Sequence, residues 1–275
     1  MKTYHEYVGL KKTKVADEFE ANLEALDRLG YFLLPSVFSA EELGEIRQKM
    51  DQIWDNQLKQ YGAELLGEIG DEGQIRAMML EDEKFFDLIL NAQIFQYVAA
   101  VIGETAILHL QNGIVLFPSK KHNQSRFHKD FPKDFQSSKL LSLNAFVLID
   151  DFDEKTGGTW LVPGSHKFEE MPSDGFLKKH SVQVIEKAGS VLIFDSLLWH
   201  RGGENRSNRV RRGINHQYTR PFIKQQLNYP ELLSDKVDPE SKLAQVLGFW
   251  SVPPKSLSEF RASDPKLRTY RPGQG

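Results

Sequence analysis

Hydrophobic residues recur every three or four positions through most of the first hundred residues, a period that predicts amphipathic helices. In Asp17–Leu29 the apolar positions share one face, and Gly30 is the residue type with which helices commonly end. Ser39 and Glu42 form a capping-box pattern at the start of a second helix. A third helical stretch covers Phe85–Ile102 and has a break near Asn91. We therefore expect a helical N-terminal part.

Short apolar runs bounded by Gly, Pro and Asp replace the helical period after Gly103. Runs of this length are typical of strands, and several in succession without intervening helices favour a sandwich or barrel over a doubly wound sheet. An earlier run, Tyr31–Pro35, also predicts a strand, and the Gly-rich residues 60–75 predict a loop. The later predicted strands are Ala106–Phe117, Leu140–Ile149, Thr159–Val162, Val182–Ile185, Ser190–Phe194 and Arg209–Thr219.

The pattern indicates one domain over residues 1–275. A helical part covers about 15–103 and a β-barrel core about 104–222. The C-terminal extension, 223–275, has a helical piece near Ser241–Leu247. A chain of this length can bury a large core without disulfides.

Composition excludes several classes of protein. Of the 275 residues, 40% are hydrophobic and 27% charged, and the net charge of −3 offers no field that would attract nucleic acid or an anionic membrane. There is no cysteine, which excludes thiol nucleophiles and iron–sulfur clusters. No apolar run reaches the roughly 20 residues of a membrane-spanning helix, and the N-terminus has no signal-peptide pattern. We expect a cytoplasmic protein, monomeric or homodimeric.

A possible metal site follows from His128, Asp130 and His200. His128 and Asp130 are two residues apart, so in an extended segment they face the same side. Two imidazoles and one carboxylate are the facial ligand set of non-haem Fe(II) oxygenases. Each motif alone is common in proteins, and a single histidine after a strand is more often structural.

A second feature is the basic strand that contains Arg209, Arg211 and Arg212. Alternation puts Arg209 and Arg211 on one face and Arg212 on the other. A guanidinium inside a barrel needs a carboxylate partner, which it can bind with two parallel hydrogen bonds. A dicarboxylate could therefore bind metal at one end and arginine at the other. Strand parity does not choose between Arg209 and Arg211.

These motifs together resemble the phytanoyl-CoA dioxygenase family of Fe(II)- and 2-oxoglutarate-dependent oxygenases. The resemblance extends over roughly residues 20–222 and implies a mainly β fold, a double-stranded β-helix (jelly-roll, cupin-like barrel) with flanking N-terminal helices. The matching segments are Phe127–Asp130, Thr156–His166, Trp199–Ser207 and Gly30–Pro35.

The resemblance also implies roles for individual residues. His128, Asp130 and His200 are similar to the iron ligands of the family. Arg211, eleven residues after His200, is similar to the arginine that binds the distal carboxylate of 2-oxoglutarate, and Arg209 is the alternative. Two further cosubstrate contacts are expected by the same comparison, namely Gln111 and Phe146.

The activity implied is oxidation of a small molecule, most simply hydroxylation, in which 2-oxoglutarate and O2 become succinate and CO2. Asp130 disfavours halogenation, because halogenating relatives lack this carboxylate. Gly202 departs from the family, which often has serine there. A basic stretch around the metal motif leaves open an acidic substrate, although a solvated loop is the simpler interpretation; it comprises Lys120, Lys121, His122, Arg126, Lys129 and Lys133.

Two other functions are compatible with these residues. One is a cupin-like metal-dependent hydrolase or isomerase, which would need no arginine for a dicarboxylate. The other is a jelly-roll protein that binds a ligand without catalysis.

Overall fold

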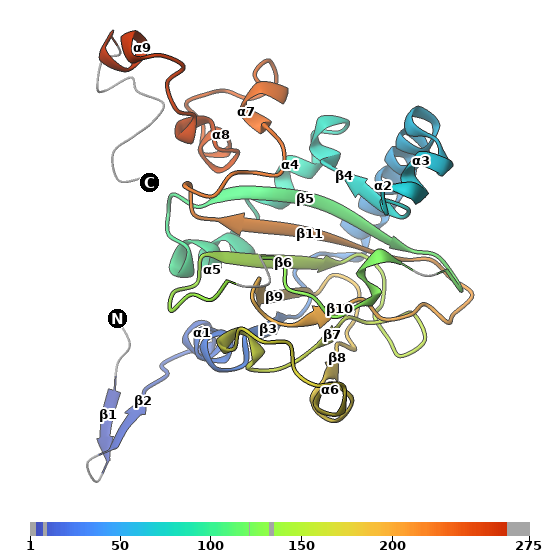
Figure 1. Cartoon of the computed structure of the whole chain (residues 1–275), viewed down its shortest axis with the longest axis vertical. Coiled ribbons are helices and arrows are strands. Elements are labelled where there is room, and N and C mark those ends of the chain that lie inside the picture. Colours follow the sequence, from blue (N-terminus) through green and yellow to red (C-terminus); the bar gives the residue numbers. More distant parts are fainter. Residues whose placement is uncertain (1–3, 8–9, 121, 132–134, 263–275) are drawn as a thin grey trace.

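A six-stranded antiparallel sheet lies at the centre of the molecule (Figure 1). The computed structural model describes residues 4–7, 10–120, 122–131 and 135–262. The strand order of the sheet is β3-β9-β6-β11-β5-β4, and a smaller three-stranded sheet has the order β10-β7-β8. The strands are β3 (Tyr31–Leu34), β4 (Gln74–Arg76), β5 (Ile107–Leu116), β6 (Ser142–Leu148), β7 (Trp160–Leu161), β8 (Val182–Gln183), β9 (Val191–Asp195), β10 (His200–Arg201) and β11 (Arg211–Thr219).

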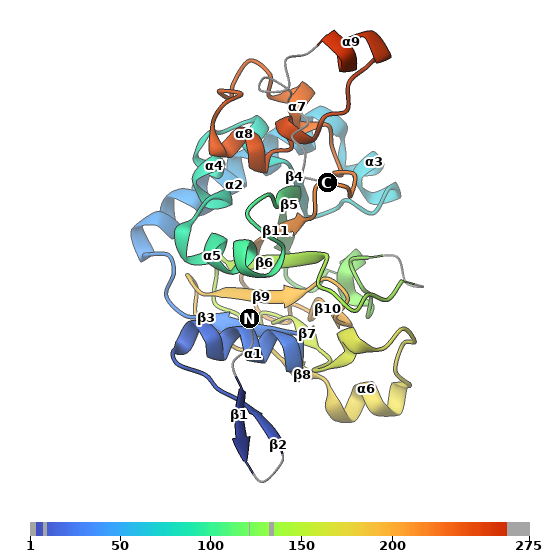
Figure 2. The ribbon, with the colours of Figure 1, turned by 90° about the vertical axis from the view of Figure 1, so that its left-hand side faces the viewer.

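Helices cover one face of the six-stranded sheet, which we call the outer face, and the three-stranded sheet packs against the other, the inner face (Figure 2). A hairpin of β1 (Tyr4–Tyr7) and β2 (Leu10–Thr13) extends away from the sheets. The helices are α1 (Glu18–Leu29), α2 (Ala40–Tyr61), α3 (Ala63–Glu68), α4 (Lys84–Ile89), α5 (Ala92–Val101), α6 (Asp174–His180), α7 (Tyr229–Leu232), α8 (Lys242–Val246) and α9 (Leu257–Ala262). Of the helices in the described part of the chain, none is both long and apolar enough to cross a membrane.

The predicted helix ends are confirmed by local hydrogen bonds. The Asp17 side chain accepts from the backbone N–H of Glu20 at the start of α1, and Gly30 ends this helix with φ 85°. Ser39 and Glu42 form the reciprocal capping box of α2. Asn91 caps α5 with its side chain, which accounts for the break between α4 and α5.

Several predictions about the fold were wrong. Residues 60–75 contain α3 and β4 as well as loops, because β4 is defined by its pairing with β5 and not by an apolar pattern. The strand predicted at Tyr31–Pro35 is confirmed as β3, whereas β4 was not predicted; both lie within residues 15–103 and belong to the six-stranded sheet. The fold is mixed and not mainly β, with 36% of the described residues in helices and 20% in strands.

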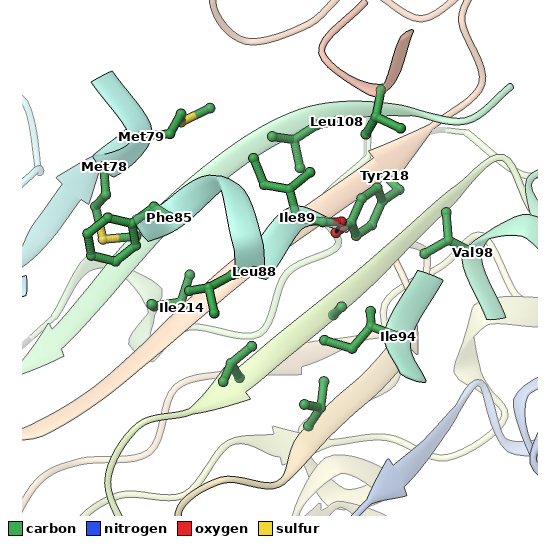
Figure 3. Packing of buried hydrophobic residues seen from close by; sticks show 14 of the residues in the cluster. Met78, Met79, Phe85, Leu88, Ile89, Ile94, Val98, Leu108, Ile214 and Tyr218 are labelled. Atoms are coloured by element: carbon green, nitrogen blue, oxygen red, sulfur yellow. Dashed lines mark hydrogen bonds between the residues drawn. The ribbon is translucent and has the colours of Figure 1, made fainter. Parts of the chain in front are cut away.

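The largest apolar core lies between the outer face and the helices. Ile214 of β11 and Leu108 of β5 pack there against α4 and α5 (Figure 3). A smaller core on the inner face joins Phe146 and Leu192 to Leu161 of the three-stranded sheet. The same strands therefore bury alternate residues in two different environments.

The register of β5 and β11 shifts by one residue near one end of this pair. Gln217 pairs with Leu110 and Tyr218 pairs with Leu108, so His109 is the extra residue of a β-bulge. The residues of β5 that point to the outer face are odd-numbered on one side of the bulge and even-numbered on the other. As a result Leu108 and Gln111, three residues apart, both point to the outer face.

Candidate metal and cosubstrate site

His128, Asp130 and His200 meet at the edge of the two sheets. His128 and His200 form an isolated antiparallel bridge, with backbone N···O distances of 2.9 and 3.0 Å in the two directions. The Asp130 N–H donates to the Ser196 carbonyl at 3.0 Å. These backbone bonds bring one potential ligand atom from each side chain within 4.8 Å of the others.

In His128 and in His200, the two ring nitrogens make different contacts. His128 Nδ1 lies 2.8 Å from the Arg126 carbonyl and His200 Nδ1 lies 2.9 Å from the Leu198 carbonyl. A carbonyl only accepts, so each Nδ1 carries the proton and each neutral ring has its lone pair on Nε2. Both Nε2 atoms face Asp130 Oδ1, at 3.5 Å from His128 and 3.6 Å from His200.

The charge states suit a divalent cation. Burial lowers the pKa of His200 to about 4, so its imidazole is neutral at pH 7. Burial alone would raise the pKa of Asp130, but the imidazoles of His200 and His128 and a hydrogen bond from Asn144 together lower it below its usual range. A neutral His200 imidazole and an ionised Asp130 carboxylate are the result, and these are the forms that bind metal.

Arg211 is buried on the inner face with little to neutralise it. Arg211 is 1% exposed, and its Nη2 donates a hydrogen bond to the Gly157 carbonyl at 2.9 Å. The guanidinium stacks on Phe152 at 4.1 Å, and its Nε and Nη1 have no partner among the residues that the structure describes. Burial lowers the pKa of Arg211 to about 9, so it remains charged at pH 7. Such a group is suited to an anionic ligand.

Arg209 is less suited than Arg211 to bind a buried anion, because of its position, its exposure and its ion pair. It precedes β11, its side chain is 58% exposed, and it pairs with Asp153 at 2.8 Å. The expectation that both arginines share one strand face does not hold, because the strand begins only at Arg211. Arg212 faces the outer side as predicted and pairs with Asp51 and Asp150.

The two remaining candidates lie on different faces of the sheet. Phe146 is buried on the inner face against Phe152, the same ring on which Arg211 stacks. Gln111 points to the outer face, where it accepts from the Met79 N–H and donates to the Phe85 carbonyl. Its placement does not support the expected contact with a cosubstrate, and a structural role in fixing the start of α4 fits its hydrogen bonds.

The sequence analysis missed a buried polar cluster on the inner face beside Asp130. Its members are joined by side-chain hydrogen bonds and are largely shielded from solvent. The available signal was the presence of polar residues at alternate positions of otherwise apolar strands. The cluster comprises Ser142, Asn144, Ser196, Asn215 and Gln217.

Comparisons with known proteins agree on the relationship. The family model described as phytanoyl-CoA dioxygenase (PhyH) matches residues 26–213. The chain belongs to the phytanoyl-CoA dioxygenase family. A relative that matches over most of its length is "Uncharacterized protein Rv1501" of Mycobacterium tuberculosis, 38% identical over 259 residues, which are 92% of this chain and 94% of the relative.

Solved structures share the fold at low sequence identity. The carbocyclase SnoK from nogalamycin biosynthesis, described as non-haem and α-ketoglutarate-dependent, is 20% identical with a TM-score of 0.55, covering 72% of this chain and 83% of SnoK. HygX from Streptomyces hygroscopicus, solved with nickel and 2-oxoglutarate bound, is 16% identical with a TM-score of 0.56, covering 74% of this chain and 88% of HygX. The antiparallel sheets are thus those of the double-stranded β-helix of 2-oxoglutarate oxygenases.

As a member of the phytanoyl-CoA dioxygenase family, the chain is an enzyme that uses Fe(II) and 2-oxoglutarate. Its residues fit both groups. The nitrogen and oxygen donors of the His128, Asp130 and His200 cluster suit iron, and the unpaired N–H groups of Arg211 suit a carboxylate.

Two other features of the family comparison depend on loops near the site. Gly202, where relatives often have serine, donates its N–H to the Gln124 carbonyl at 2.7 Å, and a Cβ there would lie 3.4 Å from the same oxygen.

In the basic stretch, Lys120 pairs with Glu72 at 2.6 Å and Lys129 donates to the Phe168 carbonyl. These lysines already have partners; Lys121 and Lys133 lie outside the described residues.

Proposed function

We propose that this enzyme hydroxylates a small molecule, with His128, Asp130 and His200 as the iron ligands and Arg211 as the anchor for 2-oxoglutarate. The overall reaction takes one substrate C–H bond, O2 and 2-oxoglutarate to an alcohol, succinate and CO2. Bound iron would supply the oxygen chemistry; the protein residues bind, orient and shield the reactants.

Arg211 is the observation that carries this proposal. A buried guanidinium whose Nε and Nη1 lack partners among the described residues is costly, and a bidentate carboxylate would remove that cost. Phe146 and Phe152 provide apolar contacts on the same inner face. A hydrolase or isomerase that used only the metal would have no need of this arginine.

The inner face also favours a class of substrate. Asn215 Oδ1 is buried without a hydrogen-bond partner among the described residues. His109 Nδ1 is a second buried atom without a hydrogen-bond partner in the described part of the chain, and it is an acceptor when the ring proton is on Nε2. Neither acceptor is suited to 2-oxoglutarate, itself an acceptor. Both favour a substrate with hydroxyl or amine groups, and the paired lysines of the basic stretch give an acidic substrate little support.

Cosubstrate binding tests the first part of the proposal. Under anaerobic conditions, Fe(II) and 2-oxoglutarate together should give a visible charge-transfer band with the wild-type protein. We expect Arg211→Leu to weaken 2-oxoglutarate binding by roughly 100-fold or more, because a desolvated charge pair is lost. Arg209→Leu is the matched control and should leave this affinity within about threefold. Equal effects of the two substitutions would refute the role of Arg211.

Substrate turnover tests the second part. Alcohols and amines would be screened for stimulation of succinate formation, each beside its O- or N-methylated counterpart. We expect stimulating compounds to be hydroxylated, with one oxygen atom from O2 in the product, and methylated counterparts to be at least tenfold poorer. A product that has lost two hydrogen atoms and gained no oxygen would show that the reaction is desaturation and not hydroxylation.

A further inference from the structure

Lys129 lies between His128 and Asp130 in the sequence, and it is a buried lysine, only 4% exposed. In an extended segment its side chain points to the face opposite that of its two neighbours. Its Nζ donates to the Phe168 carbonyl at 2.7 Å and to the Glu169 carbonyl at 3.3 Å, in the connection that precedes α6. An ammonium group is costly to bury, so its contacts here call for a specific role.

The aromatic ring that faces Lys129 belongs to Trp199, the residue before His200. His128 and His200 form the antiparallel bridge, so the next pair along, Lys129 and Trp199, are cross-strand neighbours. Lys129 Nζ lies 5.3 Å from the centroid of the Trp199 ring, within the range of a cation–π contact. The same ring packs in a small apolar cluster with Leu177 of α6. By alternation, the Lys129–Trp199 pair lies on the side of the two segments opposite the metal-site residues.

We propose that Lys129 is a positioning residue for the metal site, and that its contact with Trp199 holds the two ligand-bearing segments in the spacing that the ion requires. The inference rests on the proposed role of His128, Asp130 and His200 as iron ligands. The isolated bridge fixes the two segments at one residue pair. A contact between the next pair restrains rotation about that point, and so restrains the direction in which the ligands face.

Metal affinity measured with Co(II) alone tests the inference without substrate or cosubstrate. We expect Lys129→Met to weaken Co(II) binding by about 10-fold, the lower end of what residues behind metal ligands contribute. Its Co(II) visible spectrum should also change, because the ligands are no longer held in one arrangement. Methionine approximates the length of the lysine side chain and removes a buried charge, so this variant should fold.

Two substitutions of Trp199 test whether the face of its ring matters. Its Nε1 is buried without a hydrogen-bond partner among the described residues, so the ring acts through its face. Trp199→Phe keeps an aromatic face and should bind Co(II) within about threefold of the wild type. Trp199→Leu removes it and should weaken binding about as much as Lys129→Met, and the two losses should not add in the double variant. Equal affinities of Trp199→Phe and Trp199→Leu would contradict the ring contact, and this comparison carries the test if Lys129→Met does not fold.

Lys242 provides a control that makes the same kinds of contact. Its Nζ donates to the Glu104 carbonyl at 2.7 Å and lies 5.1 Å from the centroid of the Phe95 ring, on the outer side of the six-stranded sheet. Lys242 is exposed, so thermal unfolding of the metal-free proteins must record the stability that each variant loses. Lys242→Met should bind Co(II) as the wild type does, with an unchanged spectrum. A loss equal to that of Lys129→Met would overturn the inference.

The outcomes separate this inference from the proposed function. Lys129→Met with wild-type affinity and spectrum, alongside weakened binding by Asp130→Ala, would overturn the positioning role alone. Asp130→Ala with wild-type affinity would overturn both proposals.

Discussion

The two faces of the six-stranded sheet are built from the same strands but have opposite character. The outer face carries Val147, Ile193 and Ile214, which pack against helices. The inner face carries buried polar residues, among them Asn144 and Arg211, beside the smaller apolar core of Phe146 and Leu192. A buried polar residue costs stability unless it is paired, so the inner face is organised for binding at some cost to the free energy of folding.

Neighbouring arginines at the start of β11 make the difference clear. Arg212 on the outer side has two ion pairs, with Asp51 and Asp150, each at 2.8–2.9 Å. Arg211 on the inner side has one hydrogen bond to a neutral carbonyl. The outer arginine is neutralised within the protein, whereas the inner one is the proposed anchor for 2-oxoglutarate.

The two faces should contribute unequally to the stability of the fold. Ile214→Ala should lower the free energy of unfolding by about 2–5 kcal/mol, because it opens a cavity in a fully buried core. Ile114→Ala on the partly exposed inner face should cost clearly less. Urea denaturation of the metal-free proteins measures both, and equal losses would contradict the distinction.

Substitutions of the two arginines should change stability in opposite directions. Arg211→Leu should raise the stability of the ligand-free protein by about 1–4 kcal/mol, since it replaces an unpaired buried charge by an apolar group. Arg212→Leu should lower it by about 1–3 kcal/mol, because Asp51 and Asp150 lose their charged hydrogen bonds. Thermal unfolding without metal or 2-oxoglutarate would show whether the two changes have the same sign.

The outer face also predicts a pH dependence. Burial lowers the pKa of His216 to about 3, so between that value and pH 6.5 the unfolded chain binds more protons at this residue than the folded protein does. His216 therefore reduces stability as the pH falls below 6.5, by up to about 1.4 kcal/mol for each pH unit. We expect His216→Gln to remove this part of the slope and the exposed His180→Gln to leave it unchanged. Urea unfolding at pH 7, 6 and 5 measures the slope.

Local patterns predicted the helix ends and the shared facing of His128 and Asp130, because caps and a two-residue spacing are short-range features. His200 was added from the ligand set of non-haem iron sites and from the family resemblance. His128 and Asp130 needed only an extended segment to face the same way. Gln111 could not be placed, since the bulge at His109 changes which residues of β5 face inward. The contact between Asn144 and Asn215 could not be predicted either, because it depends on the register of β6 and β11, which the sequence of one segment does not reveal.

The backbone bridge between His128 and His200 has a consequence for how such enzymes can diversify. The two histidines are held by reciprocal bonds to each other, and Asp130 by a bond to Ser196. Strand β7 pairs with β10 at His200 and belongs to this anchor, but the connection from β7 to β8 that contains α6 can lengthen or shrink without moving it. New substrates can therefore be accommodated by remodelling that connection, while the chemistry at the centre is inherited intact.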